Sequence, residues 1–597
     1  MADLTLTLRT SPRSAASGVA REAARRRRGP TLAMIPDLWR AVIRRALTPL
    51  RIAWRRNWIY RRLLKGRMPD RIRHHPFDSL PRRLEDADML LKGRFRFAGE
   101  MVDAKEVSIF DCPAPSRNWA SALHGFGWLA SLSAAGGDAA RNLAIQLVSE
   151  WMARNARYAE PAWLPEVTAR RLVQVFAHGK FMLANSDVLW RSKLFVSLRQ
   201  QTAQLGRIAG EAPPGLPRLE ATAAYVLSCA CLDDNPRRLE SGLARLDREI
   251  ATQILPDGGH VTRSPEELLL AYRQIVMSVD ALAAVGVAVP TGLRGARDRL
   301  APMLRFFRHG DGALALFNGG GEGDAGMIAA LLARDEVRGQ PFLHAPHSGY
   351  QRLAAARSVA ILDCGGLPPA QFSQHAHAGC LAFEFSASAQ RLVVNCGSDR
   401  ESSPRWDGAL RATAAHSTVT LADTSMAPVL APGLARDLLG PRLLGGPVRI
   451  ETERHETPHG WRVEASHDFY LQEFGIRHQR EMMLSKQGTK LSGCDRLFPE
   501  PARRRRGAVT FAARFHIHPD VRVSLSHRGD ILLKLPGGEG WRFRHGGMIS
   551  VEESVYVGQG SVRRAEQLVL SGFVKDDPVE TAWTFEQIGA DASTGSA

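Results

Sequence analysis

The sequence lacks any apolar run long enough to cross a lipid bilayer. A transmembrane helix needs about 18 or more consecutive apolar residues, and no such run occurs among the 597 residues. Cysteine is also scarce, because the chain has only seven, an odd number, scattered through apolar stretches. This pattern predicts buried free thiols in a reducing compartment and argues against a disulfide framework.

Net charge is scarce outside the N-terminal region. The whole chain carries a formal net charge of +18, and residues 1–75 alone hold 19 arginines and lysines against four acids. The rest of the chain is therefore close to neutral, which argues against a nucleic-acid-binding enzyme with a basic cleft. We expect no specific nucleic-acid partner.

Residues 38–67, LWRAVIRRALTPLRIAWRRNWIYRRLLKGR, combine arginines with aromatic and aliphatic residues at helical spacing. The aromatic residues of this segment are Trp39, Trp54, Trp58 and Tyr60. Such a composition is typical of an interfacial helix on an anionic membrane surface. A solvated basic extension or an RNA-binding arm would share it. We expect Pro49 to interrupt the helix.

The basic cluster RRRRGP at 25–30 resembles the start of a signal peptide. Arginines recur every few residues after it, so no uninterrupted apolar segment follows, and we predict no signal peptide. The chain is then expected in the cytoplasm or at the inner face of the membrane. The periplasm is the alternative.

The length of the chain predicts two large domains after a basic, partly helical arm at 1–80. Amphipathic helical patterns fill residues 85–340, for example at 141–154 and 264–286. Successive helices with short connections form a bundle, a solenoid or an α/α toroid, and periodicity does not choose among them. From 345 to 590, short alternating segments separated by Gly, Pro and Asp predict an antiparallel β-sandwich.

The glycine-rich segment FNGGGEGD at 317–324 precedes the change from helical to strand patterns. It lacks the Lys-Ser/Thr ending of a phosphate-binding loop, and its surroundings are not a βαβ unit. We interpret it as a flexible connector between domains.

The stretch FSQHAHAGCLAFEFSASAQRLVVNCGS at 372–398 has the alternation of a β-hairpin but begins with two histidines one residue apart. Residues i and i+2 of a strand point to the same face, so His375 and His377 would project side by side. Two imidazoles on one face, among small neighbours, indicate a catalytic or metal site. A pair of hydrogen-bonded core histidines is the alternative.

Further motifs follow in order along the C-terminal half. They are HAHAG (375–379), RLVVNCGSD (391–399), AAHSTVTLAD (414–423), SHDFYLQEFGIRHQR (466–480), SGCDRL (492–497) and FHIHPDV (515–521). As an ordered set they resemble the C-terminal β domain of the heparinase II/III family of bacterial polysaccharide lyases. The resemblance covers about residues 345–575 and implies an α/α toroid in front of the antiparallel β-sandwich.

The resemblance implies β-elimination of a uronic-acid polysaccharide in a cleft between toroid and sandwich. The proton at C5 of the sugar is removed and the 4-O-glycosidic bond breaks. This requires positive charge near the carboxylate and a base and acid, typically Tyr or His. His375 falls at the family's catalytic histidine. His377, Asn395 and His416 fall where some members bind zinc, although the family usually has Asp in place of this Asn, and an amide is a poor zinc ligand.

The helical half departs from the family pattern. Lyases of this kind carry an Asn-His pair where this chain has PPGLPRLEA (213–221), so that Arg218 is the charged donor there. Their Tyr base follows a segment like DGGHVTRSPEE (257–267), and the nearest tyrosine here is Tyr272.

Three more side chains of the helical half are candidates for the site. His260 is a candidate catalytic group, and Arg263 could bind the substrate carboxylate. Trp163 could be a sugar-stacking platform, with core packing as the alternative.

Two functions from different classes fit this sequence. The first is a polysaccharide lyase that acts on an acidic glycan and requires no cofactor, with zinc as an optional ligand. The second is a non-catalytic or altered-chemistry relative that binds an acidic polysaccharide in envelope or exopolysaccharide handling, held at the inner membrane face by its basic arm. The β-domain motifs favour the first, and the departures in the helical half favour the second.

Overall fold

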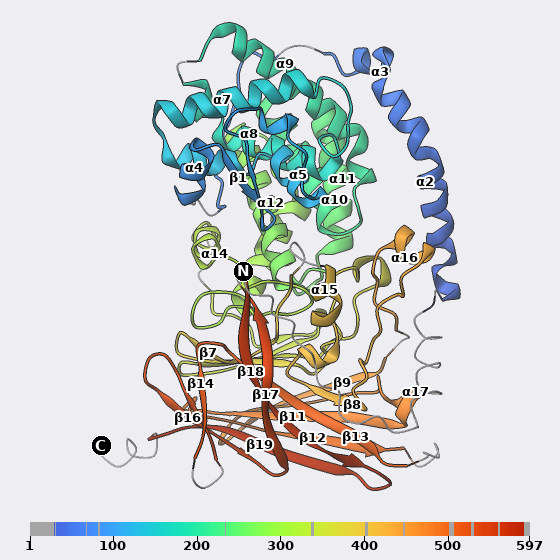
Figure 1. The fold of residues 1–597 in the computed structure, drawn as a ribbon, viewed down its shortest axis with the longest axis vertical. Helices are drawn as coiled ribbons and strands as arrows, with labels where there is room; N and C mark the ends of the chain where they lie inside the picture. Colours follow the sequence, from blue (N-terminus) through green and yellow to red (C-terminus); the bar gives the residue numbers. More distant parts are fainter. Residues whose placement is uncertain are drawn as a thin grey trace.

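The fold is a helical half stacked on a β half, with one long helix running along the side of both (Figure 1). The computed structural model describes residues 29, 31–66, 69–80, 84–184, 186–232, 235–335, 339–399, 404–445, 448–500, 507–526, 530–558 and 561–589. The basic cluster at 25–28 lies outside the described residues.

The helical half alternates almost fully buried helices with amphipathic ones. Its elements are α4 (Leu84–Leu91), the hairpin of β1 (Arg94–Phe97) and β2 (Glu100–Asp103), α5 (Arg117–His124), α6 (Trp128–Ala135), α7 (Gly137–Arg154), α8 (Pro165–Leu183), α9 (Val188–Ile208), α10 (Leu216–Leu232), α11 (Pro236–Gln253), α12 (Pro265–Ala284), α13 (Thr291–Phe306) and α14 (Ala325–Leu332). The buried helices α8, α10 and α12 pack side by side, and α7, α9, α11 and α13 cover them. This inner and outer alternation confirms the α/α toroid as an incomplete helical ring.

The β half consists of two antiparallel sheets that face each other across one hydrophobic core. One sheet has the order β14-β15-β16-β19-β12-β11-β10-β9, and the other has the order β17-β18-β13-β7-β6-β5-β4-β3, with β8 paired to β13. The bounds of the first sheet are β9 (Ile450–Thr457), β10 (Gly460–His467), β11 (Ile476–Ser485), β12 (Lys490–Pro499), β14 (Arg522–Leu525), β15 (Ile531–Lys534), β16 (Gly540–His545) and β19 (Val579–Gln587). The bounds of the second are β3 (His344–Ala345), β4 (Tyr350–Ala355), β5 (Ser358–Asp363), β6 (Phe383–Ala387), β7 (Gln390–Val394), β8 (Val419–Leu421), β13 (Val509–Ile517), β17 (Met548–Val557) and β18 (Val562–Val574). The predicted antiparallel β-sandwich is confirmed.

Strand β11 shows how the sequence alternation becomes a core. Its ten residues, IRHQREMMLS, are buried and half-buried in strict alternation, as expected for a strand with one face on the core. The inward positions include Met482 and Leu484 but also His478 and Arg480, which are both fully buried. The core of this sandwich therefore contains polar groups that must find partners inside the protein.

Helix α2 (Ile35–Arg56) continues through Pro49, which corrects the expected interruption. Pro49 removes the hydrogen bond to the carbonyl of Arg45, but residues 42–47 are exposed, so this carbonyl is open to water. The shorter helix α3 (Trp58–Leu63) follows after Asn57, whose side chain caps its first turn by accepting a hydrogen bond from the Ile59 amide. None of the described helices is long and apolar enough to cross a membrane.

The glycine-rich segment is packed into the protein, in contrast to the flexible connector that we expected. It lies between α13 and α14, and residues 313–320 are buried. Asn318 donates a hydrogen bond to the Tyr350 hydroxyl (2.9 Å) and accepts one from the His377 amide (3.3 Å). The Gly321 amide donates to Glu266 (2.9 Å). The segment therefore connects the toroid to the β half.

The cysteines are free, as predicted. Five of them are buried, and Cys112 and Cys494 are half-buried.

Candidate functional site

The two histidines of HAHAG lie on a loop, whereas the sequence predicts a strand. The loop precedes β6, and the expected hairpin is formed by β6 and β7 alone. His375 is exposed and His377 is buried, so the two rings do not share a strand face. Arg411 holds the backbone of this loop in place, because its guanidinium donates to the carbonyls of Ala376 (2.9 Å) and Ser373 (3.0 Å).

His377 and His416 form a buried pair. Nδ1 of His377 lies 3.0 Å from Nε2 of His416, and Nδ1 of His416 lies 2.9 Å from the carbonyl oxygen of Ala412. A carbonyl only accepts, so His416 donates from Nδ1 and accepts from His377 at Nε2. Burial lowers the pKa of His416 to about 4. His416 is therefore neutral near pH 7, and the two hydrogen bonds fix the orientation of its ring.

A buried ion network lies behind these loops in the sandwich core. Arg480 forms a two-pronged pair with Asp495 (2.8 and 2.9 Å) and donates to the carbonyls of Leu381 and Ser417 (both 2.7 Å). His478 also bonds Asp495, at 2.8 Å. Burial by itself would raise the pKa of Asp495, but the Arg480 guanidinium and the hydrogen bond from His478 hold it well below its ordinary value. The network positions the residues that follow His377 and His416 in the chain.

The family motifs that the sequence analysis quoted thus converge in space. Arg480 and Asp495 come from GIRHQR and SGCDRL, and both serve to hold the loops of HAHAG and AAHST. Sequence reasoning did not assign Asp495 a role, and it considered Asp468 as the partner of Arg480, which in the structure pairs with Asp495. It also missed Arg411 and Asn318, for which no motif gave a signal.

The zinc ligands predicted from the resemblance do not form a zinc site. Asn395 donates to the Leu316 carbonyl (3.1 Å), and its side-chain oxygen accepts the Ser417 amide (3.0 Å). The amide is thus already bonded, and the donor set beyond it is two neutral imidazoles. In the described ranges, no group of three or more His, Cys, Asp or Glu side chains could hold a metal ion. These residues therefore do not fit a tetrahedral zinc ion.

The toroid comes close to the HAHAG loop where Gly215 approaches Phe372, and we call the two segments around these residues, 209–216 and 370–378, the seam. A Cβ added at Gly215 would lie 3.5 Å from Cδ1 of Phe372. Arg218 lies at the start of α10 beside the seam, but its Nε and Nη2 donate to the carbonyl of Ala212 (3.0 and 2.9 Å). Arg218 thus closes its own loop, where we expected a donor to the substrate.

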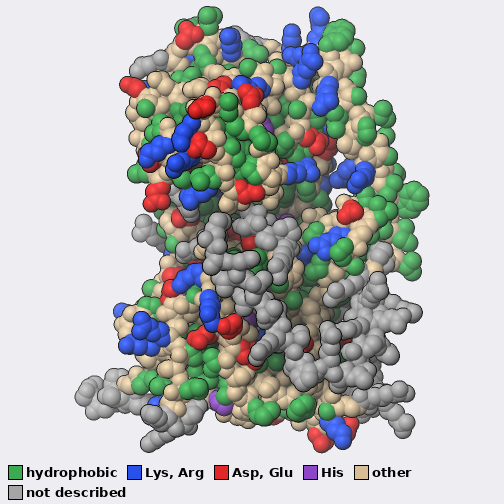
Figure 2. Space-filling model, viewed as in Figure 1, with side chains coloured by type: hydrophobic (Ala, Val, Ile, Leu, Met, Phe, Trp, Pro, Cys, Tyr) green, Lys and Arg blue, Asp and Glu red, His purple; other side chains and the backbone are tan. Residues whose placement is uncertain are grey.

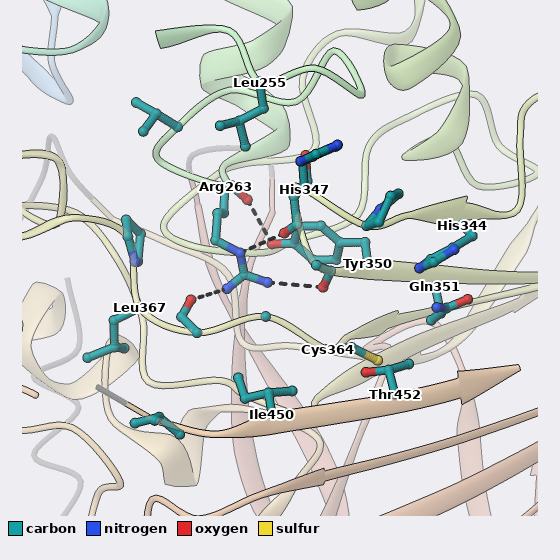
Figure 3. Close-up of a pocket in the computed structure, with 18 of the residues that line it drawn as sticks. Leu255, Arg263, His344, His347, Tyr350, Gln351, Cys364, Leu367, Ile450 and Thr452 are labelled. Carbon is teal, nitrogen blue, oxygen red and sulfur yellow. Dashed lines mark hydrogen bonds between the residues drawn. The ribbon is translucent and has the colours of Figure 1, made fainter. Parts of the chain in front are cut away.

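Arg263 is a clamp between the domains, which corrects its assignment as a substrate ligand (Figure 3). Its guanidinium donates to the carbonyls of Ser348 (2.8 Å), Gly349 (3.2 Å) and Gly366 (2.7 Å), and it pairs with Asp363. It also lies 4.7 Å from the centre of the Tyr350 ring. The side chain is buried, and these bonds occupy it.

Tyr272 lies inside the helical core, and its burial removes it from the site. It is 0% exposed, and among the described residues its hydroxyl has no hydrogen-bond partner. Burial raises its pKa to about 12. A catalytic tyrosine must reach the substrate, so this position does not support the expected role as base.

The other two candidates of the helical half also have structural roles. His260 is buried between the Thr262 hydroxyl (2.7 Å) and the Gln253 side-chain oxygen (3.1 Å). Trp163 is buried, donates to the Asn155 carbonyl (3.1 Å) and lies near Trp151. Core packing, the alternative reading of Trp163, is what the structure shows.

A cavity of about 590 Å³ opens beside the Arg263 clamp, between the loop at 254–263 and the β half (Figure 3). Its wall includes His344, His347 and Thr452 together with apolar side chains such as Leu255. His375 and His377 do not line it. The cavity and the HAHAG loop are therefore separate features of the interface between the domains.

The arrangement combines one exposed imidazole with a fixed, buried imidazole pair on the β side. On the toroid side, Tyr272 and His260 are buried, Arg263 is half-buried and bonded to the β half, and Arg218 is bonded to its own loop. Of the named candidates, those of the β side alone thus offer a base or proton carrier. Of the toroid side chains named as candidates, none is placed to neutralise a substrate carboxylate.

Comparisons with known proteins agree with this picture of the fold. The Heparinase II/III-like C-terminal domain matches residues 337–584. The FtsZ-localized protein C of Caulobacter vibrioides (strain NA1000 / CB15N) is 31% identical over 550 residues, covering 90% of this chain and 94% of that protein.

Solved structures of polysaccharide lyases share the fold. The crystal structure of heparinase III superimposes with a TM-score of 0.68 at 12% identity, covering 90% of both chains. A mutant of the heparan sulfate lyase HepC from Pedobacter heparinus superimposes with a TM-score of 0.59 at 17% identity, covering 88% of this chain and 87% of that one. With its toroid, its sandwich and its ordered C-terminal motifs, this chain belongs to the heparinase II/III family.

Proposed function

We propose that this protein acts at a membrane surface as a binding member of the family, without the elimination chemistry of its lyase relatives and without a metal. The observation that carries the proposal is the exposed apolar stripe on α2. The stripe points away from the body, and its members are Ile35, Trp39, Val42, Ile43, Leu47, Leu50 and Trp54. Hydrophobic side chains line the right-hand edge of Figure 2, where α2 runs in Figure 1.

The spacing of these residues places them on one side of the helix, opposite the face that contacts the body. Trp39 is 65% exposed and Leu50 is 67% exposed. Arginines flank the stripe, as at Arg40, Arg44 and Arg51. An apolar stripe with basic flanks favours insertion into the interface of an anionic leaflet. We propose attachment to the inner face of the membrane.

The proposed binding of a glycan polymer is supported by the family and by the lack of catalytic groups among the toroid candidates. β-Elimination needs a base, an acid and a neutralised carboxylate. The toroid candidates for these tasks are buried in the helical core or bonded elsewhere, whereas the lyase scaffold is kept. We therefore propose that the protein binds an acidic glycan, or an element of the envelope that carries one. Because its Caulobacter relative is named for localisation with FtsZ, we propose the same localisation for this chain.

The membrane proposal is tested by sedimentation with vesicles. Wild-type protein is expected to co-sediment with vesicles that contain an anionic phospholipid, and the double variant Trp39→Glu, Leu50→Glu is expected to stay in solution. The matched control is Met548→Glu, Phe573→Glu, which places the same charges on exposed apolar positions of the β half. Equal sedimentation of both double variants would exclude α2 as the attachment site.

The second candidate function is a lyase in which His375 is the base. The exposed imidazole of His375, beside the buried His377–His416 pair, favours it. The test is absorbance near 232 nm, where the unsaturated uronate product of elimination absorbs, with a panel of uronic-acid polymers. We expect no product but retained polymer binding. Product that disappears in His375→Ala would establish the lyase and refute the binding-only proposal.

A further inference from the structure

Helix α2 contacts both the β half and the toroid. At its first turns it packs on the β half, where Met34, Leu38 and Ala41 meet Leu430, Leu439 and Leu444. Asp37 accepts a hydrogen bond from Arg442 at 2.7 Å. We call this the β anchor of α2.

The β anchor leads directly to the HAHAG loop. It rests on the short helix α16 (Leu434–Leu439) and the residues around it. The Leu443 amide donates to the Ser373 hydroxyl (3.2 Å), and the Gln374 side chain donates to the Leu439 carbonyl (3.4 Å). A shift of α16 would therefore move the chain just before His375.

At its other end α2 is fixed to the toroid, in what we call the toroid anchor. Arg55 is buried, pairs with Glu211 at 2.5 Å and donates to the Tyr158 hydroxyl at 3.2 Å. Arg56 donates to the Tyr158 carbonyl at 3.1 Å. Glu211 belongs to the loop 209–216, which forms the toroid side of the seam.

Three sets of contacts and one close approach thus form a ring. The ring runs from α2 to Glu211 and along the chain to Gly215, where the backbone approaches Phe372, and then back through α16 to α2. Between the two anchors, residues 42–47 of α2 are exposed. In the described part of the chain, these contacts of α2 and the packing of Ile52 on the toroid core lie toward the two ends of the helix, which is the geometry of a strap between two bodies (Figure 1).

We propose that α2 is a strap that holds the seam closed, so that the order of the HAHAG loop depends on both anchors. The proposal rests on the proposed function in one respect: lipid on the outer stripe favours the helical, docked form of α2 and thereby tightens the seam. The isolated strap is a poor helix because it contains Pro49. Body contacts and lipid together supply the stability that it lacks.

Hydrogen exchange of the full chain tests the strap. Asp37→Asn removes the charge at the β anchor, and Glu211→Gln removes it at the toroid anchor. We expect each variant to speed amide exchange on the order of tenfold, as loss of one charged hydrogen bond allows, in both 209–216 and 370–378. Faster exchange in the segment on the other side of the seam from the substitution is the result that only a strap predicts. Arg45→Ala, in the exposed middle of α2, is the control and should leave both segments unchanged.

Exchange that rises only on the substituted side would overturn the proposal, because it would show local damage without coupling. A second arm adds anionic vesicles, which should slow exchange in both segments of the wild type. Trp39→Glu, Leu50→Glu should lose this vesicle effect but keep the protection of the free protein. If vesicles bind no protein, the membrane proposal fails, and the first arm still decides the strap. If vesicles bind but leave exchange unchanged, the lipid coupling is refuted.

Discussion

At the scale of single residues, the site is built from buried polar groups whose partners are distant in the sequence. His377 is bonded to His416, and Arg263 to Asp363. Each such group is neutral or paired because an unpaired buried charge would cost several kcal/mol, on the order given by solvation arguments. These requirements explain why residues that resemble catalytic groups in the sequence have structural roles in the fold.

The buried His416 predicts acid sensitivity. Its pKa is about 4 in the folded protein, against an ordinary value of 6.5. The unfolded chain therefore takes up a proton first as the pH falls, and the stability from this group is lost between pH 6.5 and 4. The free energy of unfolding should fall by about 2 kcal/mol from this source between pH 7 and pH 5.

Urea unfolding at the two pH values measures this loss. His416→Gln should lose about 2 kcal/mol less than wild type over the same interval. His455→Gln, at an exposed position of β9, is the control and should behave as wild type. Equal losses in all three proteins would contradict the assignment.

At the scale of elements, strands β11, β12 and β19 carry the charge network that supports the loops. Asp495 of β12 accepts from His478 and Arg480 of β11 and from the Trp583 indole of β19 (3.0 Å). One carboxylate thus joins three neighbouring strands through partners that are all buried. Its removal leaves Arg480 as an uncompensated buried charge.

We expect Asp495→Asn to lower the free energy of unfolding by about 3–5 kcal/mol, the cost of breaking a buried ion pair. Chemical denaturation of the wild type and the variant measures this difference in the free energy of unfolding. Glu580→Gln is the matched control, because Glu580 pairs with Arg496 on the same strands but is largely exposed, and it should cost no more than about 1 kcal/mol. Equal effects of the two variants would show that the network is not a support.

At the scale of the whole molecule, toroid and sandwich share a polar interface. Besides the Arg263 clamp, Arg391 pairs with Asp311 (2.8 Å), and His309 lies 3.1 Å from Glu384. Tyr556 of the β17–β18 hairpin donates to Glu322 in the glycine-rich segment. Arg391, His309 and Glu384 are buried, whereas Asp311 is exposed, and breaking such pairs makes the unfolding of one half costly for the other.

We therefore expect the two halves to unfold in one transition. Calorimetry should give a single peak whose calorimetric and van't Hoff enthalpies agree, even though domains of this size often unfold separately. Arg263→Met, which removes the clamp, should lower the midpoint and broaden or split the peak. Two well-separated peaks in the wild type would mean that the interface does not couple the halves.

The sequence by itself determined the helical half, the strand-rich half and the order of the motifs. Helical and strand periodicity are local properties, which is why the patterns at 141–154 and 264–286 and the alternation of β11 match the elements observed. The amphipathic segment at 38–67 was likewise visible from spacing alone. Only its docking across both halves, and its continuity through Pro49, needed the structure.

The tertiary structure decided which polar residues are available for chemistry. Whether Arg263 meets a substrate or a backbone carbonyl depends on residues about a hundred positions away, and no local pattern records that contact. The same holds for Tyr272, which sits on a helix face that the toroid buries. A side chain's role is set by what long-range packing places beside it, because burial and pairing fix its charge, its pKa and its reach.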